Sequence, residues 1–102
     1  MNEQQQDIGE KYVELKHSFL DRFKDEDVEL AFRFKRPSVP QSNRVQKTAL
    51  KNAGAAFKNL ILETVHPDDK QGLQAALDDY PGLASTFGGA LMGSCGFGDL
   101  GN

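Results

Sequence analysis

The feature that most constrains the fold is a strict alternation of apolar and polar side chains over residues 28–35. Four large apolar side chains share one face of this segment, namely Val28, Leu30, Phe32 and Phe34. A period of two is typical of a half-buried β-strand. A single strand cannot satisfy its own backbone N–H and C=O groups. We therefore expect a partner strand, supplied either by the N-terminal segment or by a second copy of the chain.

The segment before this strand is predicted to be a helix. Between about residues 10 and 24 its apolar side chains follow the 3–4 spacing of one helical face, and they are Tyr12, Leu15, Phe19, Leu20 and Phe23. The alternative is that part of residues 12–23 forms a strand. Residues 25–27 are expected to form a charged turn.

Apolar side chains at spacings of three and four predict further helices in the rest of the chain. One uninterrupted helix is expected from about residue 42 to 65, capped by Ser42 or Asn43. Pro67 suits the first turn of a second helix, and Pro81 suits the first turn of a third.

Together these elements predict a mainly α protein of the α+β class, with three to four helices and one short β-strand or hairpin around residues 28–35. A chain of 102 residues is long enough for one domain and too short for two. We expect a disordered N-terminus over residues 1–9, a single helix-rich domain over 10–96 and a flexible tail over 97–102. The expected core contains Phe32 or Phe34, with Phe57, Leu60, Ile61, Leu77, Leu83, Phe87 and Leu91.

The composition argues against membrane and secreted proteins. No stretch of about 20 apolar residues is present to span a bilayer. The N-terminal residues lack the basic start and apolar run of a secretory signal. A single cysteine, Cys95, excludes an internal disulfide. We therefore expect a cytoplasmic protein that acts without a membrane.

Combinations of residues suited to catalysis or metal binding are sparse. Cys95 with His66 or His17 could form a nucleophile and its base. Cys95, however, continues the apolar spacing of the last helix, which favours a buried, inert thiol. His66 with Asp68 and Asp69 lacks the spaced Cys/His ligands of a structural zinc site. We expect no enzyme activity, no cofactor and no metal.

The charges are distributed unevenly along the chain. Residues 33–58 hold seven basic side chains and no acidic one, between acidic flanks, and the net charge is -3. This candidate basic surface comprises Arg33, Lys35, Arg36, Arg44, Lys47, Lys51 and Lys58. It could bind phosphate groups, or it could be a solvated face balanced by the flanks, in this chain or in a neighbouring copy. Few aromatic side chains suited to base stacking accompany it, so the second interpretation is favoured.

Two glycines leave one face of the last helix without side chains at positions 89 and 93, and this face is called here the slim face. Gly89 and Gly93 are four residues apart and therefore share a helix face. Such a face permits close packing on another helix, within the chain or between subunits. Combined with a strand that needs a partner, it leads us to expect a homo-oligomer.

Several short motifs resemble those of the small tail assembly chaperones of tailed bacteriophages and prophages. They are Phe32-Arg33-Phe34-Lys35-Arg36-Pro37, His66-Pro67-Asp68-Asp69, Asp79-Tyr80-Pro81-Gly82-Leu83-Ala84 and a small-residue helix that closes on Gly96-Phe97. The resemblance covers roughly residues 28–97. It implies a helix-rich, self-associating protein without catalytic residues. It also implies a break in the long helix, where the apolar spacing predicts none.

The function implied by the resemblance is that of a chaperone in the cytoplasm of a bacterial host cell. Its partner would be the tape-measure protein or another tail protein, whose apolar helices it keeps soluble until the tail tube forms. Such a role needs exposed apolar side chains, and the candidates are Leu83, Phe87, Leu91, Met92, Phe97 and Leu100. The alternative is a small regulatory or nucleic-acid-associated protein that uses the basic block 33–58.

Overall fold

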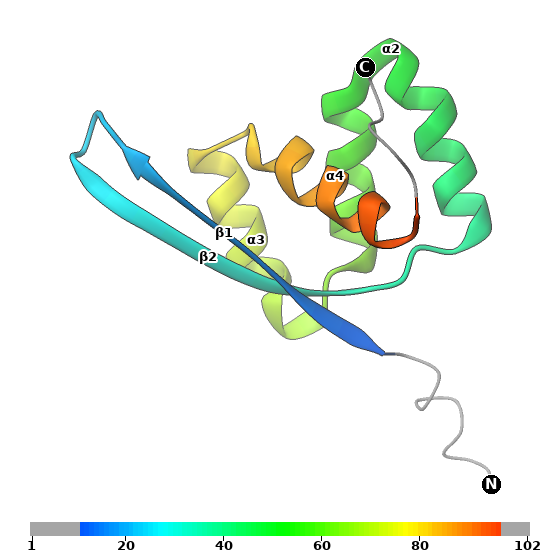
Figure 1. Ribbon diagram of the computed structural model, residues 1–102, viewed down its shortest axis with the longest axis horizontal. Helices are drawn as coiled ribbons and strands as arrows, with labels where there is room; N and C mark the ends of the chain where they lie inside the picture. The colour runs from blue at the N-terminus through cyan, green and yellow to red at the C-terminus, as the bar shows by residue number, and fades with distance from the viewer. Residues whose placement is uncertain (1–10, 97–102) are drawn as a thin grey trace, which may run out of the picture.

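The computed structural model describes residues 11–96, which form a two-stranded antiparallel sheet followed by helices (Figure 1). The elements are β1 (Tyr12–Asp21), β2 (Glu26–Lys35), α2 (Val39–Thr64), the 3-10 helix η1 (Pro67–Asp69), α3 (Lys70–Asp79) and α4 (Leu83–Ser94). The chain is thus an α+β protein, as expected. The disordered N-terminus expected at 1–9 and the flexible tail expected at 97–102 lie outside the described residues.

The N-terminal segment is a strand, and the helix predicted there is wrong. β1 pairs with β2 along its whole length, so that Leu15 lies opposite Phe32 and Phe19 opposite Val28. The apolar residues of this segment have the spacing of a helix because they occur on both faces of β1, which breaks the alternation typical of a strand. Leu15 and Phe19 pack against the core, whereas Leu20 is 50% exposed on the other face. The N-terminal segment, one of the two sources considered, is therefore the partner of the alternating strand.

The turn between the strands occupies residues 22–25 and not 25–27. One oxygen of the Asp21 carboxylate accepts hydrogen bonds from the backbone N–H groups of Phe23 (3.0 Å) and Lys24 (3.2 Å). Asp25 adopts a left-handed backbone conformation with φ of 56°, which aspartate tolerates better than most residues. Asp21 and Asp25 therefore stabilise the conformation of the turn in addition to contributing negative charge.

The N-cap of α2 lies four residues before Ser42, the first of the two expected caps. Ser38 is the N-cap: its hydroxyl accepts from the N–H of Gln41 (3.2 Å), and its own N–H donates to the Gln41 side chain (2.8 Å). This reciprocal pair is a capping box. Pro40 does not prevent the early start, because N–H groups of the first turn have no partner within the helix.

The helix α2 is broken at Asn52, so the prediction of an uninterrupted helix is wrong. Asn52 has φ of -152° and ψ of 87°, and its side-chain oxygen accepts from the N–H of Ala55 at 3.0 Å. It therefore acts as an internal N-cap. The two arms, 39–51 and 53–64, turn back on each other (Figure 1). Apolar spacing runs through the break because both arms face the same core.

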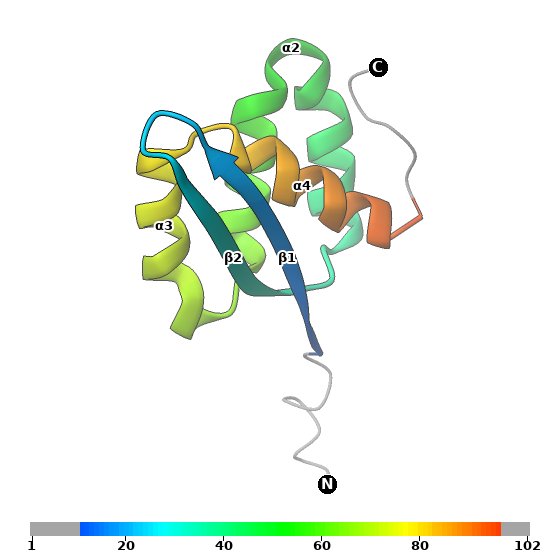
Figure 2. The ribbon, with the colours of Figure 1, turned by 60° about the vertical axis from the view of Figure 1, so that its left-hand side comes forward.

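The core lies between the inner face of the hairpin and the helices, with α3 and α4 behind the strands (Figure 2). Every side chain expected in the core is buried, including both Phe32 and Phe34. The ring of Phe87 lies 5.5 Å from that of Phe32 and 5.9 Å from that of Phe34, measured between centroids. Within residues 11–96, no helix combines the length and apolarity needed to cross a bilayer.

The close approach of two helices depends on Gly88, not on Gly89 and Gly93. A Cβ atom on Gly88 would lie 2.5 Å from Cβ of Phe57, so only glycine lets α4 pack on α2 at this point. A Cβ on Gly89 or Gly93 would meet no atom within 4 Å. The slim face noted in the sequence therefore points away from the core.

Candidate protein-binding surface

The apolar candidates on α4 lie in the core. Leu83, Phe87, Leu91 and Met92 are each at most 4% exposed. They are not the exposed apolar side chains that were expected, because α4 packs its large side chains inward and leaves small ones outside. Phe97 and Leu100 lie outside the described residues.

The basic block is divided among several elements. Arg33 forms a forked ion pair with Asp69, with Nη2–Oδ1 at 2.9 Å and Nε–Oδ2 at 3.0 Å. Arg44 pairs with Glu63 across the two arms of α2. Acidic residues of the C-terminal flank therefore pair with Arg33 and Arg44. The others are distributed over the end of β2, the residue after it and both arms of α2: Lys35, Arg36, Lys47, Lys51 and Lys58.

Asp69 fastens η1 to the outer edge of β2. Its carboxylate also accepts from the backbone N–H of Arg33 at 2.8 Å, while the C=O of Arg33 accepts from the N–H of His66 at 2.8 Å. These donors and the guanidinium charge lower the pKa of Asp69 to about 2, and the carboxylate raises the pKa of Arg33. The arrangement is structural, because both charged groups are occupied by each other.

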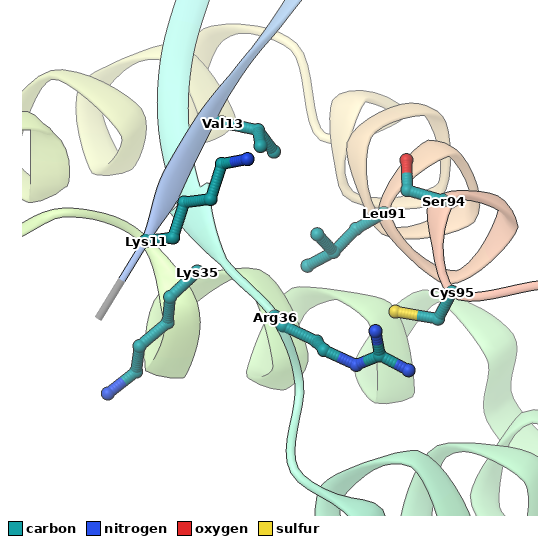
Figure 3. A pocket seen from close by; sticks show the side chains of 7 residues that line it. All are labelled: Lys11, Val13, Lys35, Arg36, Leu91, Ser94 and Cys95. Atoms are coloured by element: carbon teal, nitrogen blue, oxygen red, sulfur yellow. The ribbon is translucent and has the colours of Figure 1, made fainter. Parts of the chain in front are cut away.

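A cavity of about 340 Å³, called here the basic cavity, opens between the N-terminal end of β1 and the C-terminal end of α4 (Figure 3). Among the described residues, the lining comprises Lys11, Val13, Lys35, Arg36, Leu91, Ser94 and Cys95. Three of these described residues are basic and none of them is acidic. The Arg36 side chain reaches toward Cys95 (Figure 3). Such a lining suits a carboxylate or phosphate group.

The structure does not assemble a cysteine–histidine pair. Cys95 is half-buried, not fully buried as expected. Nδ1 of His66 accepts a hydrogen bond from the N–H of Asp68 (3.1 Å), and the His66 ring packs on the Tyr12 ring with centroids 4.6 Å apart. The centroid of the His17 ring lies 6.3 Å from that of the Phe87 ring. Among residues 11–96, no histidine is hydrogen-bonded to Cys95, and no three potential metal ligands lie together.

A second cavity, of about 560 Å³, lies at the turn end of the hairpin and is called here the aromatic cavity. Phe19 and His17 of β1, Phe23 of the turn, and Tyr80 and Pro81 before α4 all contribute to its lining. The Tyr80 ring meets the Phe19 ring edge to face, with centroids 5.0 Å apart. This arrangement leaves aromatic surface open to a partner.

Charged side chains accompany these rings. Tyr80 donates from its hydroxyl to Asp21, which raises the pKa of Tyr80 to about 12 and lowers the pKa of Asp21. Lys24 lies with Nζ 5.8 Å from the centroid of the Tyr80 ring, a cation–π contact. Asp79 also lines the aromatic cavity, so the described part of its lining contains two acidic residues and one basic residue.

Phe23 is the functional candidate that the sequence did not reveal. It is fully exposed, with a relative exposure of 103%, yet it lines the aromatic cavity. In the sequence it counted toward the buried face of a helix. The signal that could have found it is its neighbourhood, since an aromatic residue among charged turn residues has no core to enter.

Comparison with known proteins identifies a family and a fold. Residues 4–102 match the model of a family described as a domain of unknown function, DUF6848. An uncharacterised protein, rbstp2171, from Bacillus stearothermophilus has a similar structure, with a TM-score of 0.69 and 24% sequence identity over 84% of this chain and 83% of that chain. At this identity the likeness shows the fold alone. No curated protein matches the chain significantly.

Proposed function

Because this chain belongs to the DUF6848 family, a domain of unknown function, its role has to be inferred from its own surface, and we propose that it is a non-enzymatic phage tail assembly chaperone. The observation that carries the proposal is the aromatic cavity with the exposed Phe23 beside it. A fully exposed phenylalanine next to an open aromatic wall is unfavourable in water unless a partner covers it.

The motifs that carry the resemblance to tail assembly chaperones also support this surface. The motif over residues 79–84 contributes Asp79, Tyr80, Pro81, Gly82 and Leu83 to the aromatic cavity. The motif over residues 32–37 contributes two basic residues to the basic cavity. The break of α2 at Asn52 agrees with the break that the resemblance implies.

The mechanism we infer is reversible masking of apolar surface. The client is a tape-measure protein or another tail protein in the cytoplasm of the host cell, with apolar side chains that would otherwise associate. One of these side chains enters the aromatic cavity and packs on Phe23 and Tyr80, while the charged surface of the chain keeps the complex in solution. Several copies along one long client would provide the homo-oligomeric assembly expected from the resemblance.

Co-expression tests the proposal. The chain is produced together with the long protein encoded by the neighbouring tail gene, and the soluble fraction of that client is measured. Phe23→Ser is expected to lower the soluble fraction, because it removes a contact without disturbing the core. Leu50→Ser is the matched control, since Leu50 is 85% exposed on α2 and does not line the cavity.

Two outcomes would count against the proposal in different ways. If the intact chain keeps no more client soluble than an unrelated small protein does, the chaperone function is wrong. If Phe23→Ser and the wild-type chain work equally well, the chaperone function stands and its assignment to the aromatic cavity does not.

A further inference from the structure

We propose that the outer edge of β1 binds an extended segment of a partner protein, which adds to the sheet as a third strand and places a side chain in the aromatic cavity. The inference rests on the proposed function, which it deepens by specifying the conformation and the chemistry of the bound segment.

The register of the hairpin shows which backbone groups of β1 point outward. Arg33 engages Asp69 through its N–H and His66 through its C=O, both on the side of β2 away from β1. Arg33 and its partner Glu14 are therefore a non-hydrogen-bonded pair of the antiparallel ladder. Because such pairs alternate, every second residue of β1 directs its N–H and C=O outward, as do Glu14, Lys16, Ser18 and Leu20.

In the part of the chain that the structure describes, this edge of β1 is unpaired. Within residues 11–96, no backbone hydrogen bond reaches the outward groups of these four residues, and the sheet has only two strands there. From Glu14 to Leu20 the row extends about 20 Å, at about 3.3 Å per residue. The outer edge of β2, in contrast, is covered at Arg33 by η1. An open row of this kind is a template for a further strand.

Both cavities open along the same strand. His17 and Phe19 of β1 line the aromatic cavity, while Val13 at the other end of β1 and Lys11 just before the strand line the basic cavity. β1 lies between β2 and α4, so a strand added to β1 would lie over α4 (Figure 2). A segment on this edge would therefore reach both cavities at once.

The face of α4 between the two cavities carries only small side chains, so an added strand can lie over it. Thr86 lines the aromatic cavity and Ser94 lines the basic cavity. Ala90 lies between them at the i, i+4, i+8 positions of one helix face. All three side chains are small, so the inward side chains of an added strand would find space above the helix.

The charges of the cavities define the bound segment. Among residues 11–96, two acidic residues and one basic residue line the aromatic cavity, whereas three basic residues and no acidic residue line the basic cavity. The segment therefore carries an aromatic or long apolar residue beside a basic one, and an acidic residue about six positions away. Six residues of extended chain span the about 20 Å between the two ends of the edge.

An isolated segment fits this edge better than β1 of a second copy. Two antiparallel strands related by a two-fold axis keep the helices of both copies on the same face of the joint sheet. On that face α4 already lies beside β1 (Figure 2). The α4 helix of a second copy would have to occupy the same space, whereas a segment without attached helices meets no such obstacle.

Paired proline variants test the backbone edge. Ser18→Pro removes an outward N–H from β1, and Glu29→Pro makes the same change directly opposite, on the outer edge of β2. Neither N–H serves the ladder between the two strands, and proline is accepted at outward positions of edge strands. Equal thermal midpoints for the two variants verify that both retain the fold.

The probe is a synthetic nine-residue peptide of alternating threonine and valine, with a lysine–phenylalanine pair at one end and two aspartates at the other. The reversed sequence is tested as well, because a strand can add in either direction. We expect slowed amide hydrogen exchange at Glu14, Lys16, Ser18 and Leu20 when peptide binds. We expect Ser18→Pro to weaken binding by about tenfold or more, and Glu29→Pro to leave it unchanged.

Several results would overturn the added strand. They are no binding of either peptide up to about 1 mM, equal weakening by both prolines, or exchange protection confined to residues outside β1. The edge would instead be assigned to a second copy if the β1 amides of the peptide-free chain were protected from hydrogen exchange and this protection grew with protein concentration.

Co-expression separates this inference from the proposed function. If Phe23→Ser lowers the soluble fraction of the client and Ser18→Pro leaves it unchanged, the chaperone function holds and the added strand is wrong. If the peptides bind as expected while the wild-type chain keeps no client soluble, the edge is a binding site and the chaperone function is wrong.

Discussion

The hydroxyl of Tyr80 donates a hydrogen bond of 2.7 Å to Oδ2 of Asp21, across 59 positions of the sequence. The second oxygen of Asp21 accepts from the backbone of the hairpin turn, at Phe23 and Lys24. One carboxylate with 9% relative exposure therefore holds the turn and the α3–α4 connection together. These two segments form the wall and the entrance of the aromatic cavity.

Tyr80→Phe is expected to lower the thermal midpoint of unfolding. The ring and its contact with Phe19 remain, while Oδ2 of Asp21 loses its donor in a place that water reaches poorly. Thermal unfolding followed by circular dichroism measures the change. Asp79→Asn is the matched control, because Asp79 is exposed. A midpoint for Tyr80→Phe equal to that of the control would contradict the role of this bond.

Acid unfolding should depend on Asp69. The pKa of Asp69 is about 2 in the folded chain, against an ordinary value of 3.8. Folding therefore favours the charged form, and its contribution to stability is present above about pH 4 and lost as the pH falls from about 4 to 2. The measurement is the thermal midpoint of unfolding at several pH values between 6 and about 2, and the slope is the fall of this midpoint with falling pH. Asp69→Asn should reduce it, whereas Asp78→Asn should not, and equal slopes in both variants would contradict the prediction.

Alkaline unfolding should depend on Tyr80. Its pKa is raised from 10.0 to about 12 by the hydrogen bond to Asp21, by burial and by nearby acidic charge. Folding therefore favours the protonated phenol, and its contribution is present below about pH 10 and lost as the pH rises from about 10 to 12. Ultraviolet titration of tyrosinate absorbance reports the ionisation. In Tyr80→Phe the late-titrating component should be missing, and its persistence would show that another tyrosine causes it.

The strand over residues 28–35 was predictable because its pattern has one physical explanation. Alternation of large apolar and polar residues suits a sheet with one buried face, and Phe32 and Phe34 confirm it by their burial. Core membership was predictable for a related reason. Large apolar residues at regular spacing become buried whether the neighbouring backbone is helix or strand.

β1 was not predictable from its own residues. His17 occupies an inward position between Leu15 and Phe19, while Leu20 faces outward, so the alternation is imperfect. Only the pairing with β2 makes the strand the better structure, and that is a tertiary effect. The break at Asn52 was hidden for a similar reason, because asparagine is common both within helices and at their caps.

The candidate surface was misplaced on α4 for an energetic reason. A phenylalanine or leucine at regular helical spacing enters the core first, and only what the core cannot accommodate stays outside. Phe87 and Leu91 accordingly belong to the core, whereas Phe23 sits in a turn and remains exposed. The cavity beside Phe23 is assembled from the hairpin turn and residues 79–83, and no single stretch of sequence contains it.

DNA binding should be weak and independent of sequence. Arg33 and Arg44 pair with acidic residues within the chain, and the other basic residues of the block are dispersed over several elements. At physiological salt we expect a dissociation constant of about 10⁻⁴–10⁻⁶ M, typical of non-specific binding. Fluorescence anisotropy with labelled duplexes of unrelated sequence measures it. A tight complex with one duplex only would instead support the regulatory or nucleic-acid-associated alternative.

Two adjacent glycines on α4 should respond to alanine with opposite signs. At Gly88 the new Cβ would lie 2.5 Å from Cβ of Phe57, so α4 must move away from α2 or distort. Overpacking of this kind lowers the free energy of unfolding by about 1–3 kcal/mol. At Gly89 the new Cβ would meet nothing within 4 Å, and alanine in a helix is favoured over glycine by about 0.5–1 kcal/mol.

Urea unfolding of the two variants and the wild-type chain measures both effects under the same conditions. Because the two positions are neighbours on one helix, helix propensity contributes about equally to both variants, and the difference between them isolates the contact between Gly88 and Phe57. We expect Gly88→Ala to unfold at lower urea concentration than the wild type and Gly89→Ala at higher. If Gly88→Ala were as stable as Gly89→Ala, α4 could not lie as close to Phe57 as described, and Gly88 would not be the residue that sets the spacing of the two helices.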